Sequence, residues 1–310
     1  MLTDETLSLF ISATPSMSLS TLLSQTAGTC LNPSLSDAIF PLGRGLQSWT
    51  TLQSAGDALP ISDETFRPTR CIKALSRDTV ISPEPDSRPA MLAVFPKGSC
   101  SLSNTNGGFS FYSPGPENVD LTTAKEVTFG YSVMFEEGFQ FNMGGKLPGL
   151  CECSFCLFVI GTHKAQDGGD NEEVAAACSG GRHNEGGWSV RLMWRTGGAG
   201  EMYTYLPRSF SANLAQCRVP PFSTSSPTYG TSVGRGSFFF QPGDWTSVVQ
   251  RMRLNDAGQE NGELEVIVNG QSKINVSGLV LRSSEAGRIR GMQMQTFFGG
   301  SFSLPYVASN

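Results

Sequence analysis

Two segments joined by a glycine-rich stretch carry the side chains best suited to proton chemistry. The first runs from Trp188 to Arg195, the second from Glu201 to Leu206, and Thr196–Gly200 lies between them. Apolar and polar residues alternate in both segments, a pattern that is typical of β-strands, whose successive side chains point to opposite faces. The sequence therefore predicts a β-hairpin with one polar and one apolar face.

Strand alternation sorts the side chains of this hairpin. Ser189, Arg191, Met193 and Arg195 share one face of the first strand, whereas Trp188, Val190, Leu192 and Trp194 share the other face and are predicted to be core. If Arg195 faces Glu201 across the five-residue loop, Met193 lies opposite Tyr203 and Arg191 lies opposite Tyr205. Two tyrosines then lie beside two arginines.

Phenols beside cations can act as acids or bases. A free tyrosine titrates near pH ~10, and a neighbouring positive charge favours the phenolate. The arginines also suit an anionic ligand, although the chain as a whole carries a net charge of −5. The alternative is that Tyr203 and Tyr205 are ordinary sheet residues and that the arginines are solvated.

Two further pairs of residues could extend the polar face and bind substrate. Arg251 and Arg253 alternate with apolar neighbours, and so do Gln293 and Gln295. An exposed sheet face without function is the alternative, because the sequence does not show which sheet these strands join.

Composition indicates an all-β protein. Only 16% of the 310 residues are charged, and the chain holds 35 glycines and 18 prolines, which suits short strands joined by turns. Strand patterns recur from Glu126 to Phe298, and Asn269-Gly270 is a strong signal for a type I′ hairpin turn. No apolar run reaches the ~20 residues of a membrane helix, and an isoelectric point near 5.2 argues against nucleic-acid binding.

These signals predict a single antiparallel β-sandwich or jelly roll over residues 37–310. Residues 1–36 are expected to form an irregular, partly helical extension that packs on this core, because their leucines lie among serines and threonines. We expect a monomer.

The eight cysteines favour a secreted, disulfide-bonded protein. The alternative is a zinc site in which Cys153 and Cys156 form one pair of ligands and Cys178 and His183 a looser second pair. We expect disulfides and no metal. The sequon at Asn275 is a candidate glycosylation site, and we expect that a signal peptide has been removed.

Six short motifs between Phe40 and Phe302 resemble the fungal branch of polysaccharide lyase family 14, which includes alginate lyases and lyases of glucuronic acid polymers. They are Phe40–Gly43, Val119–Lys125, Gly144–Leu150, Arg191–Glu201, Gly234–Ser237 and Gln295–Gly300. The resemblance implies a β-jelly roll whose concave face binds the substrate. The chain departs from the family in an insertion after Leu150, which contains clustered cysteines and the polar run Asp167–Glu173.

The resemblance also implies a catalytic set, which in this sequence is Lys146, Ser189, Arg191, Tyr203 and Tyr205. Alternation alone places four of these residues on the polar face; Lys146 rests on the resemblance only. The implied reaction is β-elimination on an acidic polysaccharide, without a cofactor. Cations would neutralise the uronate carboxylate, and either tyrosine, or Lys146, would be the base.

Several alternatives stay open from the sequence. Mannuronate and glucuronate share their configuration at C4 and C5, so the motifs do not distinguish alginate from glucuronan as the substrate. A non-catalytic lectin could bind the same glycans on the same face, and a structural wall protein would need neither Lys146 nor the tyrosines. A glycoside hydrolase needs two carboxylates, and the polar face offers only Glu201, which we expect to pair with Arg195.

Overall fold

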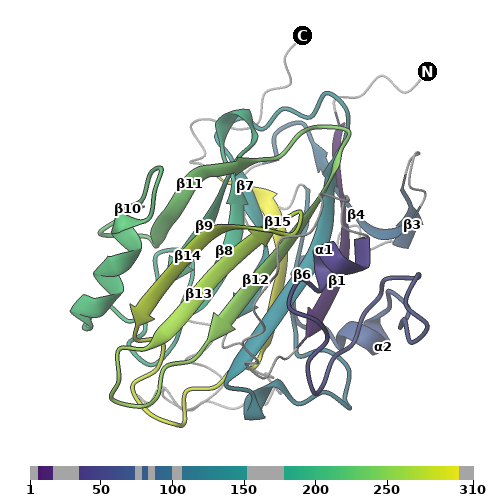
Figure 1. Cartoon of the computed structure of the whole chain (residues 1–310). Helices are drawn as coiled ribbons and strands as arrows, with labels where there is room; N and C mark the ends of the chain where they lie inside the picture. The colour runs from purple at the N-terminus through teal and green to yellow at the C-terminus, as the bar shows by residue number, and fades with distance from the viewer. Residues whose placement is uncertain are drawn as a thin grey trace, which may run out of the picture.

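The structure is a computed structural model, and it describes residues 6–16, 35–73, 79–82, 88–99, 107–151 and 178–299. Within these ranges the strands form two antiparallel sheets (Figure 1). Sheet 1 has there, in spatial order, seven strands: β14 (Gln271–Leu279), β13 (Gly262–Val268), β12 (Trp245–Arg253), β6 (Glu126–Phe135), β1 (Thr6–Ser16), β4 (Pro89–Pro96) and β3 (Thr79–Ile81). Sheet 2 has there eight: β10 (Thr224–Ser225), β11 (Thr231–Phe239), β9 (Ala199–Tyr205), β8 (Ser189–Trp194), β7 (Gly145–Cys151), β15 (Gly291–Phe298), β5 (Phe109–Ser113) and β2 (Thr69–Lys73).

The helices of the described residues are short and lie outside the sheets. They are α1 (Leu35–Ile39), α2 (Asp63–Phe66) and the 3-10 helices η1 (Leu121–Thr123), η2 (Thr196–Gly198) and η3 (Ser211–Arg218). Helix α1 contacts β12 and β6 on the outer side of sheet 1 (Figure 1). Ser62 caps α2, because its hydroxyl accepts a hydrogen bond from the Thr65 amide at 3.3 Å.

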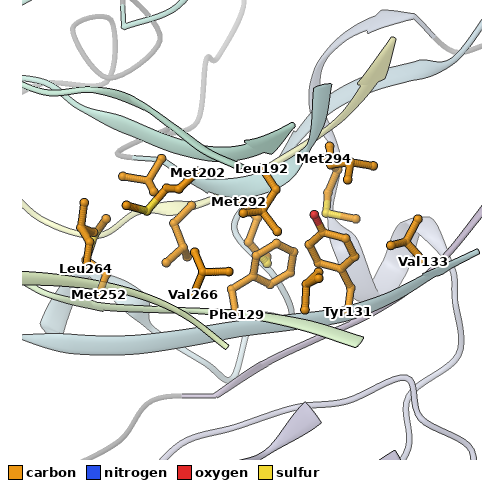
Figure 2. Packing of buried hydrophobic residues seen from close by; sticks show 14 of the residues in the cluster. Phe129, Tyr131, Val133, Leu192, Met202, Met252, Leu264, Val266, Met292 and Met294 are labelled. Carbon is orange, nitrogen blue, oxygen red and sulfur yellow. The ribbon is translucent and has the colours of Figure 1, made fainter. Parts of the chain in front are cut away.

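The core lies between the two sheets. Figure 2 shows Phe129, Tyr131 and Val133 of β6 reaching towards Leu192, Met292 and Met294 of sheet 2, and all six side chains are buried. Trp194 belongs to an aromatic cluster in this core: its ring centroid lies 5.3 Å from that of Phe135 and 5.5 Å from that of Phe298. Burial of each such side chain contributes about 1.5–3 kcal/mol. The predicted antiparallel sandwich is confirmed.

Strand alternation and turn chemistry account for much of this architecture. The strand patterns of the sequence begin at Glu126 and end at Phe298, and these residues are the first of β6 and the last of β15. Asn269 and Gly270 have φ values of 48° and 78°, the two positive angles that a type I′ turn requires. The apolar residues of β12 alternate as predicted, with Val248 and Met252 in the core.

The expectation for the N-terminal extension is wrong for residues 6–16, which form strand β1 instead of an irregular or helical lead-in. The reason is that the strand pairs on both edges, with β4 and with β6. The sequence does carry a period of two here, in Leu7, Leu9 and Ile11. The division of domains at residue 36 stays a prediction.

The register of the β8–β9 hairpin differs from the prediction by two residues. The observed pairs are Met193 with Glu201, Arg191 with Tyr203 and Ser189 with Tyr205. Gly197 and Gly198 adopt positive φ angles of 69° and 79°, and the Arg195 amide bonds the Ala199 carbonyl at 2.8 Å, so the loop is tighter than assumed. A shift of two preserves parity, and the predicted faces of both strands are confirmed.

Candidate active site

Sheet 2 turns one face to the core, and the other face, called here the polar face, carries polar side chains from six adjacent strands. The side chains that interact there are Ser110, Tyr112, Lys146, Ser189, Arg191, Met193, Glu201, Tyr203, Tyr205, Ser232, Gln293 and Gln295. Cations, phenols and amides therefore converge on a single surface. The five residues of the predicted catalytic set all belong to it.

Arg191 lies in the middle of the polar face and is only 2% exposed. Its Nη1 donates to Oε1 of Gln295 at 2.6 Å, and Gln295 in turn donates to Ser110 Oγ at 2.8 Å. Nε of Arg191 is buried without a hydrogen-bond partner, and no carboxylate of the described residues pairs with the guanidinium. Burial lowers its pKa, although the nearby tyrosines oppose this effect. An unpaired buried cation is costly, so this position is prepared for an anion.

Lys146 reaches the polar face from β7 and is partly buried. Its Nζ lies 2.8 Å from Sδ of Met193 and 3.4 Å from the ring centroid of Tyr203. Burial lowers the pKa of Lys146 well below its usual range, repulsion from Arg191 and Arg195 lowers it further, and Glu201 opposes the shift. This direction favours the neutral amine, the form that a base requires.

A β-bulge brings Lys146 to this face. Lys146 pairs with Met193 and Gly149 pairs with Arg191, so two residues of β7, Leu147 and Pro148, oppose one residue of β8. Positions 146 and 149 would lie on opposite faces of a regular strand, but the extra residue puts both on the polar face. Proline lacks an amide donor and occurs within sheets mainly at bulges and edges.

Two side chains from the inner face of sheet 1 hold the bulged strand. The hydroxyl of Tyr131 donates to the Pro148 carbonyl at 3.0 Å, and Oε1 of Gln250 accepts from the Leu150 amide at 3.1 Å. All these groups are buried, where an unpaired polar group costs about 1–3 kcal/mol. Sheet 1 therefore fixes the backbone that carries Lys146.

Each of the two tyrosine hydroxyls accepts a backbone hydrogen bond. The amide of Gly230 donates to Tyr203 at 3.1 Å, and the amide of Gly181 donates to Tyr205 at 3.1 Å. Residue 230 has to be glycine, because a Cβ there would lie 2.9 Å from atoms of both tyrosine rings. A pocket of about 390 Å³ adjoins Tyr205 at this end of the face.

Burial raises the pKa of Tyr203 to about 12, Tyr205 adds to the shift, and Arg195 opposes it. The expectation that nearby cations lower the pKa of this phenol is therefore wrong for Tyr203. The reason is that the cost of burying a phenolate exceeds the attraction from the neighbouring guanidinium. This shift favours the neutral phenol, the form that can donate a proton.

Glu201 is fully buried between two arginines. Its Oε1 pairs with Nη2 of Arg195 at 2.5 Å and its Oε2 with Nε of Arg235 at 2.7 Å, and Ser232 donates to Oε2 at 2.5 Å. Burial raises the pKa of Glu201, but the hydrogen bond and charge of Arg195, with the other two donors, outweigh this and leave it lowered. The predicted pairing with Arg195 is confirmed. A carboxylate held in this way is unsuited to glycoside hydrolysis.

The remaining predicted residues divide between the two sheets. Gln293 lies on the polar face and donates to the hydroxyl of Tyr112 at 3.2 Å. Ser189 is buried there too, but its hydroxyl donates to the Cys178 carbonyl at 2.6 Å. The catalytic and binding roles of these residues stay predictions.

Arg251 and Arg253 do not extend the polar face, because β12 belongs to sheet 1. Nε of Arg251 donates to Glu126 at 2.9 Å, and both arginines pair with Glu263. Their partners lie on the neighbouring strands β6 and β13, so the cations are neutralised across the outer face of sheet 1. The prediction that these arginines lie on the polar face with the other site residues is therefore wrong. Alternation shows which residues of a strand share a face, but it does not show which sheet the strand joins.

Part of the cysteine prediction falls outside the described residues. Cys153, Cys156 and the polar run Asp167–Glu173 lie there, so the zinc alternative and any disulfide of these two cysteines are not tested. Among the described residues Cys178 and Cys217 carry thiols, so the expectation of disulfides is wrong for these two. His183 lies with its ring 5.0 Å from that of Tyr205, and its Nε2 is 3.1 Å from the Thr228 carbonyl. Among the described residues no three potential metal ligands gather, and no helix is both long and apolar enough to cross a membrane.

The lowered pKa of Lys146 has a consequence for stability. Between its folded-state pKa and its unfolded value of ~10.4 the unfolded chain binds more protons, so the free energy of unfolding should rise with pH in that window. We expect Lys146→Met to be more stable than the wild type at pH 7 and to lose this advantage as the pH approaches 10. Urea unfolding at several pH values measures the difference, and Lys273→Met reports the effect of removing an exposed lysine. A difference for Lys146→Met that does not change with pH would contradict the assignment.

Comparison with known proteins agrees with this geometry. The chain matches the family model described as polysaccharide lyase 14 over residues 83–305. The solved structure of a marine PL-14 alginate lyase from Aplysia kurodai is 31% identical over 68% of this chain and 75% of that one, with a TM-score of 0.53. An alginate lyase from Chlorella virus is 24% identical over 74% and 83% of the two chains, with a TM-score of 0.52, and shows the shared fold. No curated protein matches the chain. The chain belongs to polysaccharide lyase family 14.

Proposed function

We propose that this polysaccharide lyase cleaves a 1,4-linked polyuronate by β-elimination on the polar face of sheet 2. The observation that carries the proposal is the buried guanidinium of Arg191, which has no carboxylate partner among the described residues. A uronate carboxylate would supply the missing negative charge, and a neutral sugar would not.

The reaction removes the proton on C5 and expels the oxygen on C4. The C5–H and C4–O bonds break, a C4–C5 double bond forms, one proton passes to the base, and one proton passes to the leaving oxygen. The carboxylate at C5 opposes carbanion formation unless its charge is neutralised. Nε of Arg191 is free to bind that carboxylate, while Gln295 fixes the guanidinium from the other side.

The opposite pKa shifts of two adjacent groups assign the proton transfers. Lys146, whose pKa is lowered, accepts the C5 proton, and Tyr203, whose pKa is raised, donates to the leaving oxygen. The Lys146 ammonium that forms lies 3.4 Å from the Tyr203 ring centroid, where the ring face favours a cation. Tyr205 is positioned beside Tyr203 and lines the same surface.

The substrate that we propose is polymannuronate or glucuronan, because their units share the C4 and C5 configuration. The 31% identical protein from Aplysia kurodai is an alginate lyase, which favours polymannuronate. The sequence motifs support a place in the fungal branch of the family. We also propose that the protein is secreted and monomeric; Asn275, in the sequon, is exposed on the edge strand β14.

The test is the growth of near-ultraviolet absorbance from unsaturated uronates on polymannuronate, polyguluronate and glucuronan. We expect growth with the wild type on at least one of the two proposed polymers. Lys146→Ala and Tyr203→Phe should each reduce the rate at least ~100-fold, the typical contribution of a general acid or base. Arg253→Gln, which removes a cation from the outer face of sheet 1, should retain the wild-type rate.

Other outcomes of this experiment have definite meanings. Binding of a polymer without absorbance growth would replace the lyase with the lectin alternative. Full activity of Tyr203→Phe together with loss in Tyr205→Phe would transfer the acid role to Tyr205. Full activity of Lys146→Ala would reject Lys146 as the base.

The contact between the sheets should matter for catalysis as well as for stability. Tyr131→Phe leaves the Pro148 carbonyl unpaired, and we expect a loss of about 1–3 kcal/mol in the free energy of unfolding. Because β7 then loses a fixed point next to Lys146, kcat should fall while KM changes little. Val133→Ala, on the same strand, also removes buried atoms but leaves the hydrogen bond to Pro148 intact, so it should lower stability and leave kcat unchanged. Equal effects of the two variants on kcat would show that Tyr131 acts only through stability.

A further inference from the structure

Arg235 is aimed at the polar face by an irregularity in β11. The register of this strand with β9 shifts between Val233 and Phe238. Gly234 and Gly236 flank the arginine with φ angles of 63° and 84°, which side-chain-bearing residues rarely adopt. The resulting bulge turns the Arg235 side chain towards Glu201, as bulges often re-aim a side chain.

Two exposed aromatic residues lie beside this arginine. The guanidinium of Arg235 is 5.2 Å from the ring centroid of Phe222, and the Arg235 amide bonds the Phe222 carbonyl at 2.8 Å. Phe239 pairs with Ala199 on β9, and because its neighbours Phe238 and Phe240 are core residues, it points to the polar face. Phe222 is 50% exposed and Phe239 is 55% exposed. Two large apolar side chains, Phe222 and Phe239, are thus exposed to solvent at the edge of the site.

The charge at this edge is positive. Arg195 and Arg235 share one carboxylate, that of Glu201. In the described part of the chain, Nη1 of Arg195 and Nη1 of Arg235 make no hydrogen bond to another residue. The two side chains are 23% and 34% exposed, so these donors can meet a ligand. A second carboxylate would balance the pair.

We propose that Phe222, Phe239, Arg195 and Arg235 form a binding subsite for a uronate unit of the polymer outside the unit that is cleaved. The flat apolar side of a pyranose stacks on an aromatic ring, and the carboxylate of the same unit binds the free guanidinium nitrogens. The position fits a more distant unit of the polymer, because Ala199, opposite Phe239, lies four residues, or about 13 Å, along β9 from Tyr203, which is farther than a single pyranose unit extends. This inference rests on the proposed function and adds the residues that hold the polymer.

The test compares the wild type with Phe222→Ala and Phe239→Ala on a long polyuronate and on the shortest oligomer that the wild type cleaves. For the long polymer we expect KM to rise roughly three- to tenfold with kcat unchanged. For the shortest oligomer, which does not reach the subsite, we expect no change in KM. Leu42→Ala is the control, because Leu42 is 48% exposed and follows α1, on the side of sheet 1. It should leave KM unchanged for both substrates.

The outcomes separate the subsite from the function itself. A wild type that cleaves the polymer, with both variants keeping its KM, would overturn the subsite and leave the lyase intact. An equal rise in KM on long and short substrates would also overturn it, because the rings would then shape the central site. A wild type that cleaves no polyuronate would reject the proposed function and this inference with it. If an alanine variant unfolds, the leucine variants, which keep apolar bulk but lose the flat ring, should show the same loss on the long polymer.

Discussion

The bulge at Leu147 and Pro148 is the constraint on which the site depends. Without the extra residue, Lys146 would point into the core and Leu147 would occupy its place on the polar face. The core holds the bulge open, because Tyr131 bonds the Pro148 carbonyl and Gln250 bonds the Leu150 amide. Two buried hydrogen bonds thus connect β6 and β12 to the backbone of β7, the strand that carries Lys146. The sandwich therefore fixes part of the chemistry as well as supporting it.

Several arginines gather on the polar face, although the sandwich fold does not need positive charge there. Glu201 is neutralised by two arginines and a hydroxyl, an arrangement that leaves an excess of positive charge beside it. Arg191 lies deeper and has an amide, Gln295, where a structural ion pair would have a carboxylate. Arg251, by contrast, is paired with glutamates on both neighbouring strands of sheet 1. The contrast between paired and unpaired arginines is what distinguishes the functional face from an ordinary sheet surface.

Strand alternation was enough to place Ser189, Arg191, Tyr203 and Tyr205 on one face, because a period of two survives an error of two in the register. Alternation gave no correct placement where a strand is bulged or where its sheet is unknown. Lys146 could not be placed, since a bulge reverses parity, although Pro148 within a strand pattern was a signal for one. Arg251 and Arg253 were misplaced because the partner sheet of a strand depends on long-range pairing. Arg235 was missed as a site residue, yet its two flanking glycines were visible in the sequence.

Burial shifts the pKa values of Lys146 and Tyr203 in opposite directions. Removing water disfavours the charged form of each group, so it lowers the pKa of an amine and raises that of a phenol. Lys146 and Tyr203 lie in contact, and burial displaces their pKa values away from each other, the lysine downwards and the tyrosine upwards. An amine that gives up its proton readily and a phenol that retains its own are the states that the proposed reaction requires at its start, because Lys146 would then gain a proton and Tyr203 would lose one. Desolvation is the largest cause of the lysine shift, so the burial of Lys146 on the bulged strand is what favours the neutral amine that the proposed elimination needs.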